Sequence, residues 1–346
     1  MTTDFWVSCR PTTETDRGEW EDLVDRSAII PGFSQRFDCS VVDAQEGIQS
    51  LFIAVRTREG QLVGGARVTV QRRFPSRYLE MLGGPVFLQG HEDTARALVS
   101  KALRESVRVI DRGQFRPTAG HPWHLDQFGL HRTNVPAETV LVDLARTEDE
   151  LWRGVDHSVR QGVRKAKDHG VTFRELTTES EIERAYPLIE RFGHQRDFAA
   201  ITKTRLLATQ RIFHPVGRSF VFLCEAGSEP AAVSVVLLTN QRASLLVVAS
   251  APEFAKLQVT SLLDWESMRF SRARGATSFD FLGLPPAGTG LDGLRRFKLK
   301  WGGTVVGGEE YLEGVVFRLA TSLVRRWPGL SHSVLMNRGP PTPGRM

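Results

Sequence analysis

The sequence has few cysteines and no long apolar segment. Only Cys9, Cys39 and Cys224 occur in the 346 residues, and no two of them form a Cys-x-x-Cys pair. An odd, scattered set of three predicts neither a disulfide framework nor a thiolate zinc site, and it favours a reducing compartment. No apolar run reaches the length of a membrane span, and residues 1–10 lack the apolar core of a secretory signal. We therefore expect a cytoplasmic protein without a membrane span.

Several catalytic motifs are missing as well. The sequence holds no Gly-x-Ser-x-Gly nucleophile elbow and no kinase-type glycine loop. The segment His121-Pro122-Trp123-His124 has no glutamate beside its histidines, and Pro122 prevents a helical presentation of the pair, so we expect no metal site. Cys224 lies in an apolar run and is expected in the core. Any chemistry must then rest on positioning and on the stabilisation of charge by cations.

What is present is the composition of a folded, moderately basic protein. Hydrophobic residues make up 41% of the chain and charged residues 25%, as in ordinary globular proteins. The length favours two domains. The formal net charge is +5 and the pI is near 9.4. A polyanion or a phosphorylated small molecule is a reasonable partner for such a chain.

The pattern of apolar residues repeats between the two halves of the chain. Each half runs helices, a hairpin, a strand, a long amphipathic helix and a strand. The first copy spans strands at 50–57, 61–70 and 78–82, a helix at 92–111 and a strand at 115–119; the second spans strands at 219–225, 231–239 and 243–250, a helix at 260–274 and a strand at 277–282. We predict an α/β (α+β) fold of two tandem modules, mixed sheets flanked by helices, with domains at 1–145 and 146–330 and a loose Pro/Gly-rich tail at 331–346.

This order of elements is that of the acyltransferase fold that binds acetyl-CoA. In that fold a loop of the form Gln/Arg-x-x-Gly-x-Gly/Ala opens the central helix and holds the pyrophosphate. Residues 61–66 match these letters but lie inside a predicted strand, with no helix after them. The loops at 88–93 and 253–260, which do precede the central helices, lack the glycine pattern. Binding of CoA is therefore disfavoured.

A basic helix opens the second module. Thr147 and Glu150 form a capping box, and Gly170 supplies a stop after His169, so a single helix is expected over 147–169. On a helical wheel one stripe is apolar and the stripe beside it is basic. The apolar stripe holds Trp152, Val155, Val159, Val163 and Ala166, and the basic one holds Arg153, His157, Arg160, Arg164 and Lys167.

A second basic segment lies between glycines at 290–303. Arg295, Arg296, Lys298 and Lys300 have no carboxylate among them, which favours an anionic partner. Helical spacing places Leu294, Phe297 and Trp301 on one side, where they can anchor the segment. The alternative is an amphipathic surface helix whose cations are only solvated.

Short stretches in the same order resemble the FemABX family, non-ribosomal aminoacyltransferases that take an amino acid from aminoacyl-tRNA to extend peptidoglycan cross-bridges. The similarity spans about residues 30 to 320. The stretches are Phe33-Ser34-Gln35, Leu82-Gly83-Gly84-Pro85-Val86, Leu151-Trp152 with Arg160, Arg164-Lys165-Ala166-Lys167, Gly170-Val171, Phe279-Asp280-Phe281-Leu282-Gly283, Phe297-Lys298 and Trp301-Gly302-Gly303. The tandem acyltransferase-like domains of that family agree with the repeat.

The resemblance implies roles for individual residues. Lys298 falls on the Phe-Lys position, where a lysine stabilises the negative charge that develops on the ester carbonyl oxygen, and Asp280 is expected to orient an amine or to act as an ordinary loop or cap residue. The remaining candidates are substrate or tRNA contacts, with Phe297 and Trp301 as anchors of the lysine: Arg160, Arg164, Lys165, Lys167, Arg295, Arg296, Lys300 and Gln35. Relatives acting on nucleotide-linked muropeptides follow the early Gln motif with a Trp and a Lys, and residues 36–43 here contain neither.

We therefore expect an aminoacyltransferase that uses aminoacyl-tRNA as co-substrate and no cofactor. The acceptor is expected to be an amine or hydroxylamine of a natural-product intermediate, or a peptidoglycan precursor. A CoA-dependent N-acyltransferase of the same fold and a non-catalytic tRNA-binding protein are the alternatives. The sequence leaves open the amino acid, the acceptor, the oligomeric state and the general base, for which Asp280, Glu310, water and the substrate are candidates.

Overall fold

The computed structural model describes residues 5–11, 13–73, 76–110, 112–133, 137–196 and 200–313, so the expected tail at 331–346 lies outside the described residues. The chain divides into two compact units, residues 1–135 with 308–346 and residues 136–307. Within the described parts, no helix is both long and apolar enough to pass through a bilayer.

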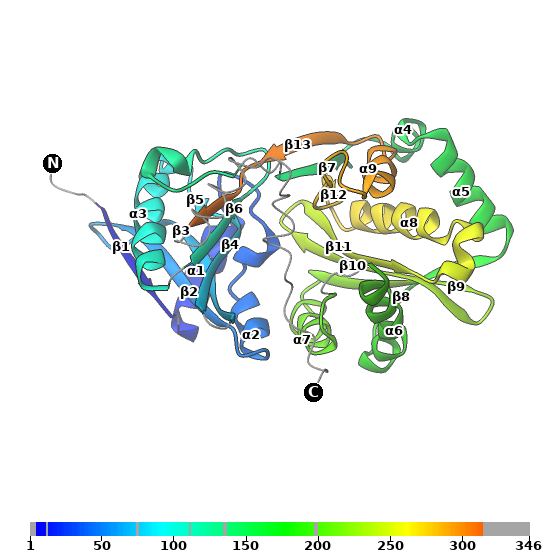
Figure 1. Ribbon diagram of the computed structural model, residues 1–346, viewed down its shortest axis with the longest axis horizontal. Helices are drawn as coiled ribbons and strands as arrows, with labels where there is room; N and C mark the ends of the chain where they lie inside the picture. Colours follow the sequence, from blue (N-terminus) through cyan, green and yellow to red (C-terminus); the bar gives the residue numbers. More distant parts are fainter. Residues whose placement is uncertain are drawn as a thin grey trace. The chain divides into compact units, whose positions relative to one another are not determined.

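The first unit is a mixed sheet with the long helix α3 packed against it (Figure 1). The sheet order is β1-β2-β3-β4-β6-β14, and β5 pairs with β3. Its elements are β1 (Phe5–Arg10), η1 (Glu14–Asp16), α1 (Arg17–Asp25), η2 (Phe33–Gln35), α2 (Cys39–Ala44), β2 (Gln49–Thr57), β3 (Leu62–Arg73), β4 (Ser76–Gly84), β5 (Val86–Phe87), α3 (Glu92–Ile110), β6 (Arg112–Pro117), η3 (Leu125–Phe128) and β14 (Tyr311–Glu313). Ala95, Val99, Ala102 and Leu103 repeat at helical spacing on α3 and are buried against the sheet.

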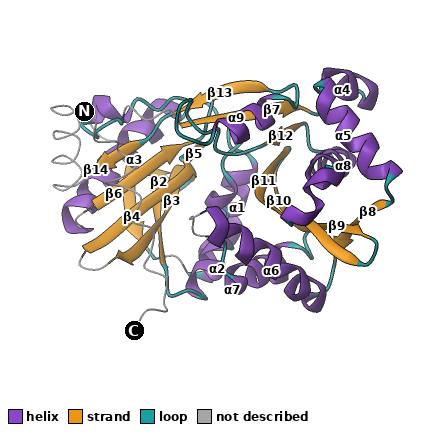
Figure 2. Cartoon of the chain, turned by 45° about the vertical axis from the view of Figure 1, so that its right-hand side comes forward, coloured by secondary structure: helices purple, strands orange, loops and turns teal. Residues whose placement is uncertain are grey.

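The second unit is also a mixed sheet, covered by helices on both faces (Figure 2). The sheet order is β13-β7-β12-β11-β10-β9-β8. Its elements are β7 (Ala137–Asp143), α4 (Glu148–Gly154), α5 (His157–Asp168), β8 (Val171–Leu176), α6 (Glu179–Arg196), α7 (Lys203–Phe213), β9 (Ser219–Ala226), β10 (Glu229–Thr239), β11 (Arg242–Ser250), η4 (Pro252–Leu257), α8 (Val259–Ala273), β12 (Ser278–Asp280), α9 (Asp292–Leu299) and β13 (Thr304–Gly308). Helices α5 and α8 share one apolar cluster with the sheet, and α6 and α7 pack on other parts of it.

The prediction of two mixed sheets flanked by helices is confirmed. The expected hairpins are present as β2–β3 and β9–β10, and the long central helices as α3 and α8. The strands of each sheet do not all come from one half of the chain, however. Strand β14, near residue 311, pairs with β6 of the first sheet, and β7 pairs with β12 of the second. The first sheet therefore takes a strand from far along the chain, and β7, which lies within the predicted first domain, belongs to the second sheet.

The single helix expected over 147–169 is wrong in one respect, because the chain breaks at Val155 and Asp156. Val155 adopts an extended conformation with ψ 138°, and the Asp156 side chain caps α5 by accepting a bond from the Ser158 N–H at 2.9 Å. The backbone N–H of Asp156 donates to the Lys300 carbonyl at 2.8 Å. This long-range bond and the Asp cap together favour a new helix over a continuous one.

Strands β11 and β12 pair over only three residues. Arg242, Ala243 and Ser244 lie opposite Ser278, Phe279 and Asp280 in parallel register. Strand β11 continues to Ser250, whereas β12 ends at Asp280. Beyond that point the two strands are no longer paired, so backbone carbonyls just after β12 are available to side chains from elsewhere.

Candidate active site

Lys298 lies on α9 and reaches the segment that follows β12. Its ammonium donates to three backbone carbonyl oxygens, those of Phe281 at 2.8 Å, Gly283 at 2.9 Å and Leu282. Leu282 and Gly283 have positive φ values of 45° and 39°. Leu282 is not a glycine, so this conformation is costly, and it coincides with the turn whose carbonyls surround the lysine.

Burial changes the protonation of Lys298. Loss of solvent lowers the pKa of this lysine to about 8, and the charges of Asp264 and Asp280 partly oppose that effect. A lysine ammonium has three donor hydrogens, and all three have carbonyl acceptors here. The ammonium is therefore fully hydrogen-bonded to the backbone, and a substrate oxygen can bind it only by replacing one of these carbonyls.

Asp280 is buried at the end of β12, with 5% of its surface exposed. Its Oδ1 accepts from the Thr139 hydroxyl and, at 2.9 Å, from the Leu282 N–H. Burial raises the pKa of this carboxyl, while these two bonds and the charges of Arg242 and Lys298 oppose the rise. The bond to Leu282 ties Asp280 to the turn that holds Lys298.

Asp264 was not expected from the sequence as a site residue. It lies on α8 with 1% of its surface exposed, and neither carboxylate oxygen has a hydrogen-bond partner among the described residues. Burial raises its pKa to about 8, and the charge of Lys298 lowers it in part. The one signal in the sequence was an acidic residue inside the apolar run 262–265, on a helix expected to be buried.

The Trp-Gly-Gly motif fixes the end of the lysine segment. Trp301 is 1% exposed and stacks on Phe281 with ring centroids 5.5 Å apart, and Phe297 contacts Trp301 edge to face at 5.9 Å. A Cβ on Gly302 would lie 2.5 Å from the Gly154 carbonyl oxygen, and one on Gly303 would lie 2.7 Å from that of Leu141. Both glycines are needed for this close approach, which brings the lysine helix beside β7 and the end of α4.

The other cations of the segment have partners that are distant in sequence. Arg295 forms an ion pair with Glu138 at 2.9 Å and donates to the Pro285 carbonyl at 2.8 Å. Lys300 donates to the Ser158 hydroxyl at 2.8 Å. Arg296 is exposed. The charge imbalance seen along the sequence is thus partly offset in three dimensions.

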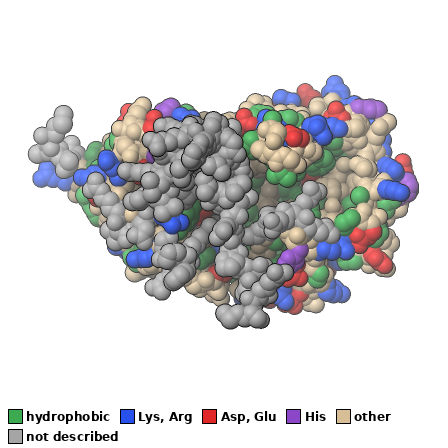
Figure 3. All heavy atoms as spheres, viewed as in Figure 1, with side chains coloured by type: hydrophobic (Ala, Val, Ile, Leu, Met, Phe, Trp, Pro, Cys, Tyr) green, Lys and Arg blue, Asp and Glu red, His purple; other side chains and the backbone are tan. Residues whose placement is uncertain are grey.

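The cations of α5 are also partly engaged. Arg160 donates to the carbonyls of Trp152 and Arg153, Arg164 lies over the Trp152 ring at 5.8 Å, and Lys167 pairs with Glu266 at 2.8 Å. Lys165 is exposed. On the face seen in Figure 3, the Lys and Arg side chains of this unit are interspersed with Asp and Glu.

Two further candidates from the sequence lie in the first unit. Gln35 is fully buried, and its amide bonds the backbone of Arg67 at 2.8 and 3.1 Å and the Leu82 carbonyl at 2.7 Å. Glu310 accepts from Arg116 at 2.6 Å and from Gln114. Within this unit both side chains thus support the backbone and the sheet.

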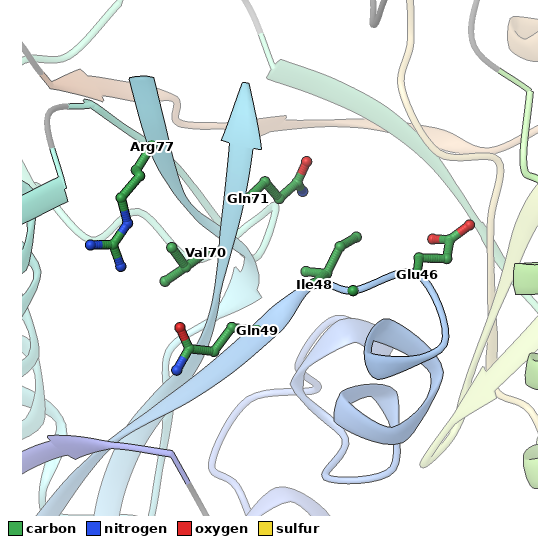
Figure 4. A pocket seen from close by; sticks show the side chains of 7 residues that line it. Glu46, Ile48, Gln49, Val70, Gln71 and Arg77 are labelled. Atoms are coloured by element: carbon green, nitrogen blue, oxygen red, sulfur yellow. The ribbon is translucent and has the colours of Figure 1, made fainter. Parts of the chain in front are cut away.

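A pocket of about 550 Å³ opens in the first unit, and Figure 4 shows the side chains that line it. Gln49, Val70 and Arg77 lie together on one side of it, and Glu46 lies at the other end. None of the residues predicted from the sequence as site residues lines this pocket. The polar groups around Lys298 lie in the second unit, so the candidate site is there.

The segment that resembles a pyrophosphate loop in letters is confirmed to lie in a strand, since β3 begins at Leu62. Helix α8 is instead entered through η4 and Gln258, which has a φ of 59°. Among the described residues, no group of three His, Cys, Asp or Glu side chains is placed to hold a metal ion.

Comparison with known proteins identifies the type of domain. Residues 153–308 match the family model of the acetyltransferase (GNAT) domain. No curated protein sequence matches the chain. Among solved structures, FemX has a TM-score of 0.70 at 15% identity over 92% of this chain and 99% of its own. L-PGS from Bacillus licheniformis has a TM-score of 0.59 at 12% identity over 93% and 98%.

A tandem GNAT protein from the clavulanic acid biosynthesis pathway has a TM-score of 0.56 at 15% identity over 89% of this chain and 98% of its own. At these identities the likeness concerns the fold. The chain therefore shares the FemX-like fold of two GNAT-like modules, and together with the matched domain this indicates an acyltransferase enzyme.

Proposed function

We propose that the protein transfers an amino acid from aminoacyl-tRNA to an amine, hydroxylamine or hydroxyl group of a small acceptor. The observation that carries the proposal is the half-buried ammonium of Lys298, held at the end of β12 beside Asp280 in the GNAT-type domain. The FemABX resemblance of the Phe297-Lys298 and Trp301-Gly302-Gly303 motifs and the FemX-like fold support this chemistry.

An aminoacyl ester is already activated, so its transfer depends on orientation and on stabilisation of the oxyanion. In the proposed step the acceptor nitrogen attacks the ester carbonyl carbon, and Lys298 gives the carbonyl oxygen one N–H that now bonds a backbone carbonyl. The C–N bond forms, the C–O bond to the tRNA ribose breaks, and the ribose oxygen takes up a proton. No protein nucleophile is needed.

We propose Asp280 as the residue that orients the attacking amine and takes its proton. Its Oδ1 is held by Thr139 and Leu282, which fixes the direction of the carboxylate. The raised pKa of this carboxyl improves it as a proton acceptor relative to an exposed aspartate. Water or the substrate amine itself remains the alternative acceptor.

The tRNA contacts are assigned to the basic residues of α5 and of the lysine segment. Arg164, Lys165 and Arg296 have no carboxylate partner among the described residues, so we propose them as the main phosphate contacts. Arg160, Lys167, Arg295 and Lys300 can contribute by exchanging a present partner for phosphate. Phe297 and Trp301 hold the lysine, and Gln35 would act on substrate only through the backbone it supports.

The acceptor is proposed to be a natural-product intermediate or a muropeptide, in the cytoplasm. The related fold of the tandem GNAT protein from the clavulanic acid pathway supports the first choice. The absence of the Trp and Lys that usually follow the early Gln motif weighs against the second.

The direct test is incubation with a full set of charged tRNAs, each carrying a labelled amino acid, with and without a small-molecule extract of cells. We expect one amino acid to move from acid-precipitable tRNA into a small product, and only when extract is present. If no charged tRNA loses its amino acid faster than in buffer, the proposal is wrong.

A CoA-dependent N-acyltransferase is the second candidate, because the matched family model is that of acetyltransferases. The same extract with labelled acetyl-CoA in place of tRNA distinguishes the two. Incorporation from acetyl-CoA alone would favour this candidate.

A further inference from the structure

A row of polar side chains crosses the sheet of the second unit beside Asp280. Thr239 of β10 lies opposite Arg242 of β11, and Arg242 lies opposite Ser278 of β12. Residues in register point to the same face of a sheet. The row therefore presents two hydroxyls and one guanidinium side by side, and Asp280 lies two residues farther along the same face.

This face is opposite to the apolar cluster beneath α5 and α8. Ala243 and Phe279, which alternate with Arg242 and Asp280, belong to that cluster. Because side chains alternate along a strand, the polar row points away from it. The row is thus a local departure from the apolar packing that the rest of the sheet uses.

Most of the row is buried, and its members lack hydrogen-bond partners at some atoms within the described residues. Arg242 is 9% exposed and Thr239 is 2% exposed. Arg242 Nε, Thr239 Oγ1 and Ser278 Oγ are buried atoms with no hydrogen-bond partner in the described part of the chain. No hydrogen bond or ion pair joins Arg242 to Asp280 there. Burial lowers the pKa of Arg242, and the charge of Asp280 opposes this in part. Three adjacent unsatisfied polar groups are unusual in a folded protein.

We propose that Arg242, Thr239 and Ser278 form a binding site for an oxyanion, a carboxylate or a phosphate group of a small-molecule ligand. A guanidinium offers a planar fork of donors that matches both groups, and two flanking hydroxyls can each add a bond. An anion there would satisfy the buried charge, which otherwise costs stability.

The position of the row beside Asp280 suits it to hold the acceptor, an inference that rests on the proposed function. Asp280 is the group proposed to receive the proton of the attacking amine, and the row is its neighbour on the same face. An acceptor that carries an amine and an acidic group can then be held by its anion at Arg242 while its amine meets Asp280. Such bidentate holding selects amino acids, phosphorylated amines and similar acceptors.

The experiment measures thermal stability of the full chain in inorganic phosphate, in acetate and in chloride at equal ionic strength. The variants are Arg242→Met and, as a matched control, Arg184→Gln, an exposed arginine of the same unit. Phosphate stabilises most proteins non-specifically, so the readout is the difference between proteins in the same buffer. Phosphate and acetate separate the two classes of anion.

We expect saturating phosphate or acetate to raise the Tm of the wild type and of Arg184→Gln by about 2–4 °C more than that of Arg242→Met. In chloride we expect Arg242→Met to melt at the same temperature as the wild type or above it, since the substitution removes a buried charge that has no partner among the residues the structure describes. The difference in Tm between Arg242→Met and the wild type then depends on the buffer, which a loss of folding cannot imitate.

Two results would overturn the site. One is an equal response of all three proteins to both anions. The other is a lower Tm of Arg242→Met in every buffer by the same amount, which would mark Arg242 as a structural residue bridged by water to its neighbours. Neither result depends on whether tRNA is the acyl donor, so failure of the site and failure of the proposed function can be told apart.

Discussion

One buried arginine in each unit is held in a different way. In the first unit, the guanidinium of Arg67 pairs with Asp43, donates to the Ser34 carbonyl at 2.6 Å and donates to the Ser50 hydroxyl at 3.0 Å. In the second unit, Arg242 and Asp264 have no such partners within the described residues. Both arginines are buried to a similar degree, at 4% and 9% exposed.

The difference agrees with the anion site proposed for the second unit. Satisfied buried charges fix a structure, whereas unsatisfied ones cost stability and persist at sites where another function requires them. The first unit uses Arg67 and Gln35 to join its hairpin to the preceding segment. The second unit gathers, around β12, a lysine of lowered pKa, a buried carboxyl and an arginine that has no carboxylate partner in the described part of the chain. Substitutions in each unit test this difference.

The largest effect is expected in the first unit. Asp43→Ala leaves Arg67 buried without its carboxylate and should lower the free energy of unfolding by about 3–5 kcal/mol. Urea denaturation measures this. The control is Asp22→Ala, which removes only the exposed pair with Arg26 and should cost less than about 1 kcal/mol. Equal losses of unfolding free energy in the two variants would mean that the buried pair stabilises the fold no more than the exposed pair does.

Lys298→Met should reduce kcat/KM for aminoacyl transfer by about 100–1,000-fold, the usual effect of removing one oxyanion donor. The fold should persist, since methionine keeps the length and apolar stem of the side chain. Single-turnover kinetics measure the loss of transfer, and circular dichroism of the same sample checks that the fold persists. Undiminished transfer would remove Lys298 from the mechanism.

The titration of Lys298 should affect activity and stability in opposite directions. Its pKa is lowered from 10.5 to about 8, so kcat/KM should fall as the pH rises through about 8 and the ammonium is lost. Between about pH 8 and 10.5 the unfolded chain still holds the proton that the folded protein has released, so the free energy of unfolding should rise with pH. Lys298→Met should flatten the stability profile in this window, and an unchanged profile would contradict the assignment.

Asp280→Asn tests the neighbour of the lysine. The charge of Asp280 raises the pKa of Lys298, so its removal should move the alkaline fall of kcat/KM lower by roughly one pH unit. Asparagine can keep the bonds to Thr139 and Leu282. A loss of activity that is the same at every pH would indicate that Asp280 acts only on the acceptor.

The smallest effect is expected at the surface. Lys165→Gln should weaken tRNA binding a few-fold and reduce the slope of log K against log salt by about one, with no change in stability. Lys101→Gln, at an exposed position of the first unit, is the control and should change neither quantity. If both substitutions weaken tRNA binding equally, tRNA does not bind preferentially to the second unit.

Local structure could be predicted from the sequence where its causes are local. The capping box predicted at Thr147 is present, with the Glu150 side chain bonded as the motif requires. The apolar run at 231–239 and the helical spacing at 260–274 placed β10 and α8 within one or two residues. Strands β1 and β8 were missed, because short half-buried strands carry a weak period.

The candidate site depended on contacts between distant segments. The sequence by itself determined the tandem modules and the basic segment at 290–303, which follow from periodicity and composition, and the FemABX resemblance of Phe297-Lys298 implied Lys298 as a site residue. Only the tertiary structure paired Arg295 with Glu138, returned β14 to the first sheet, placed three carbonyls around Lys298 and left Arg242 unpaired among the described residues. The physical reason is that pairing and burial depend on which strands lie side by side, and that order is fixed by packing over the whole chain.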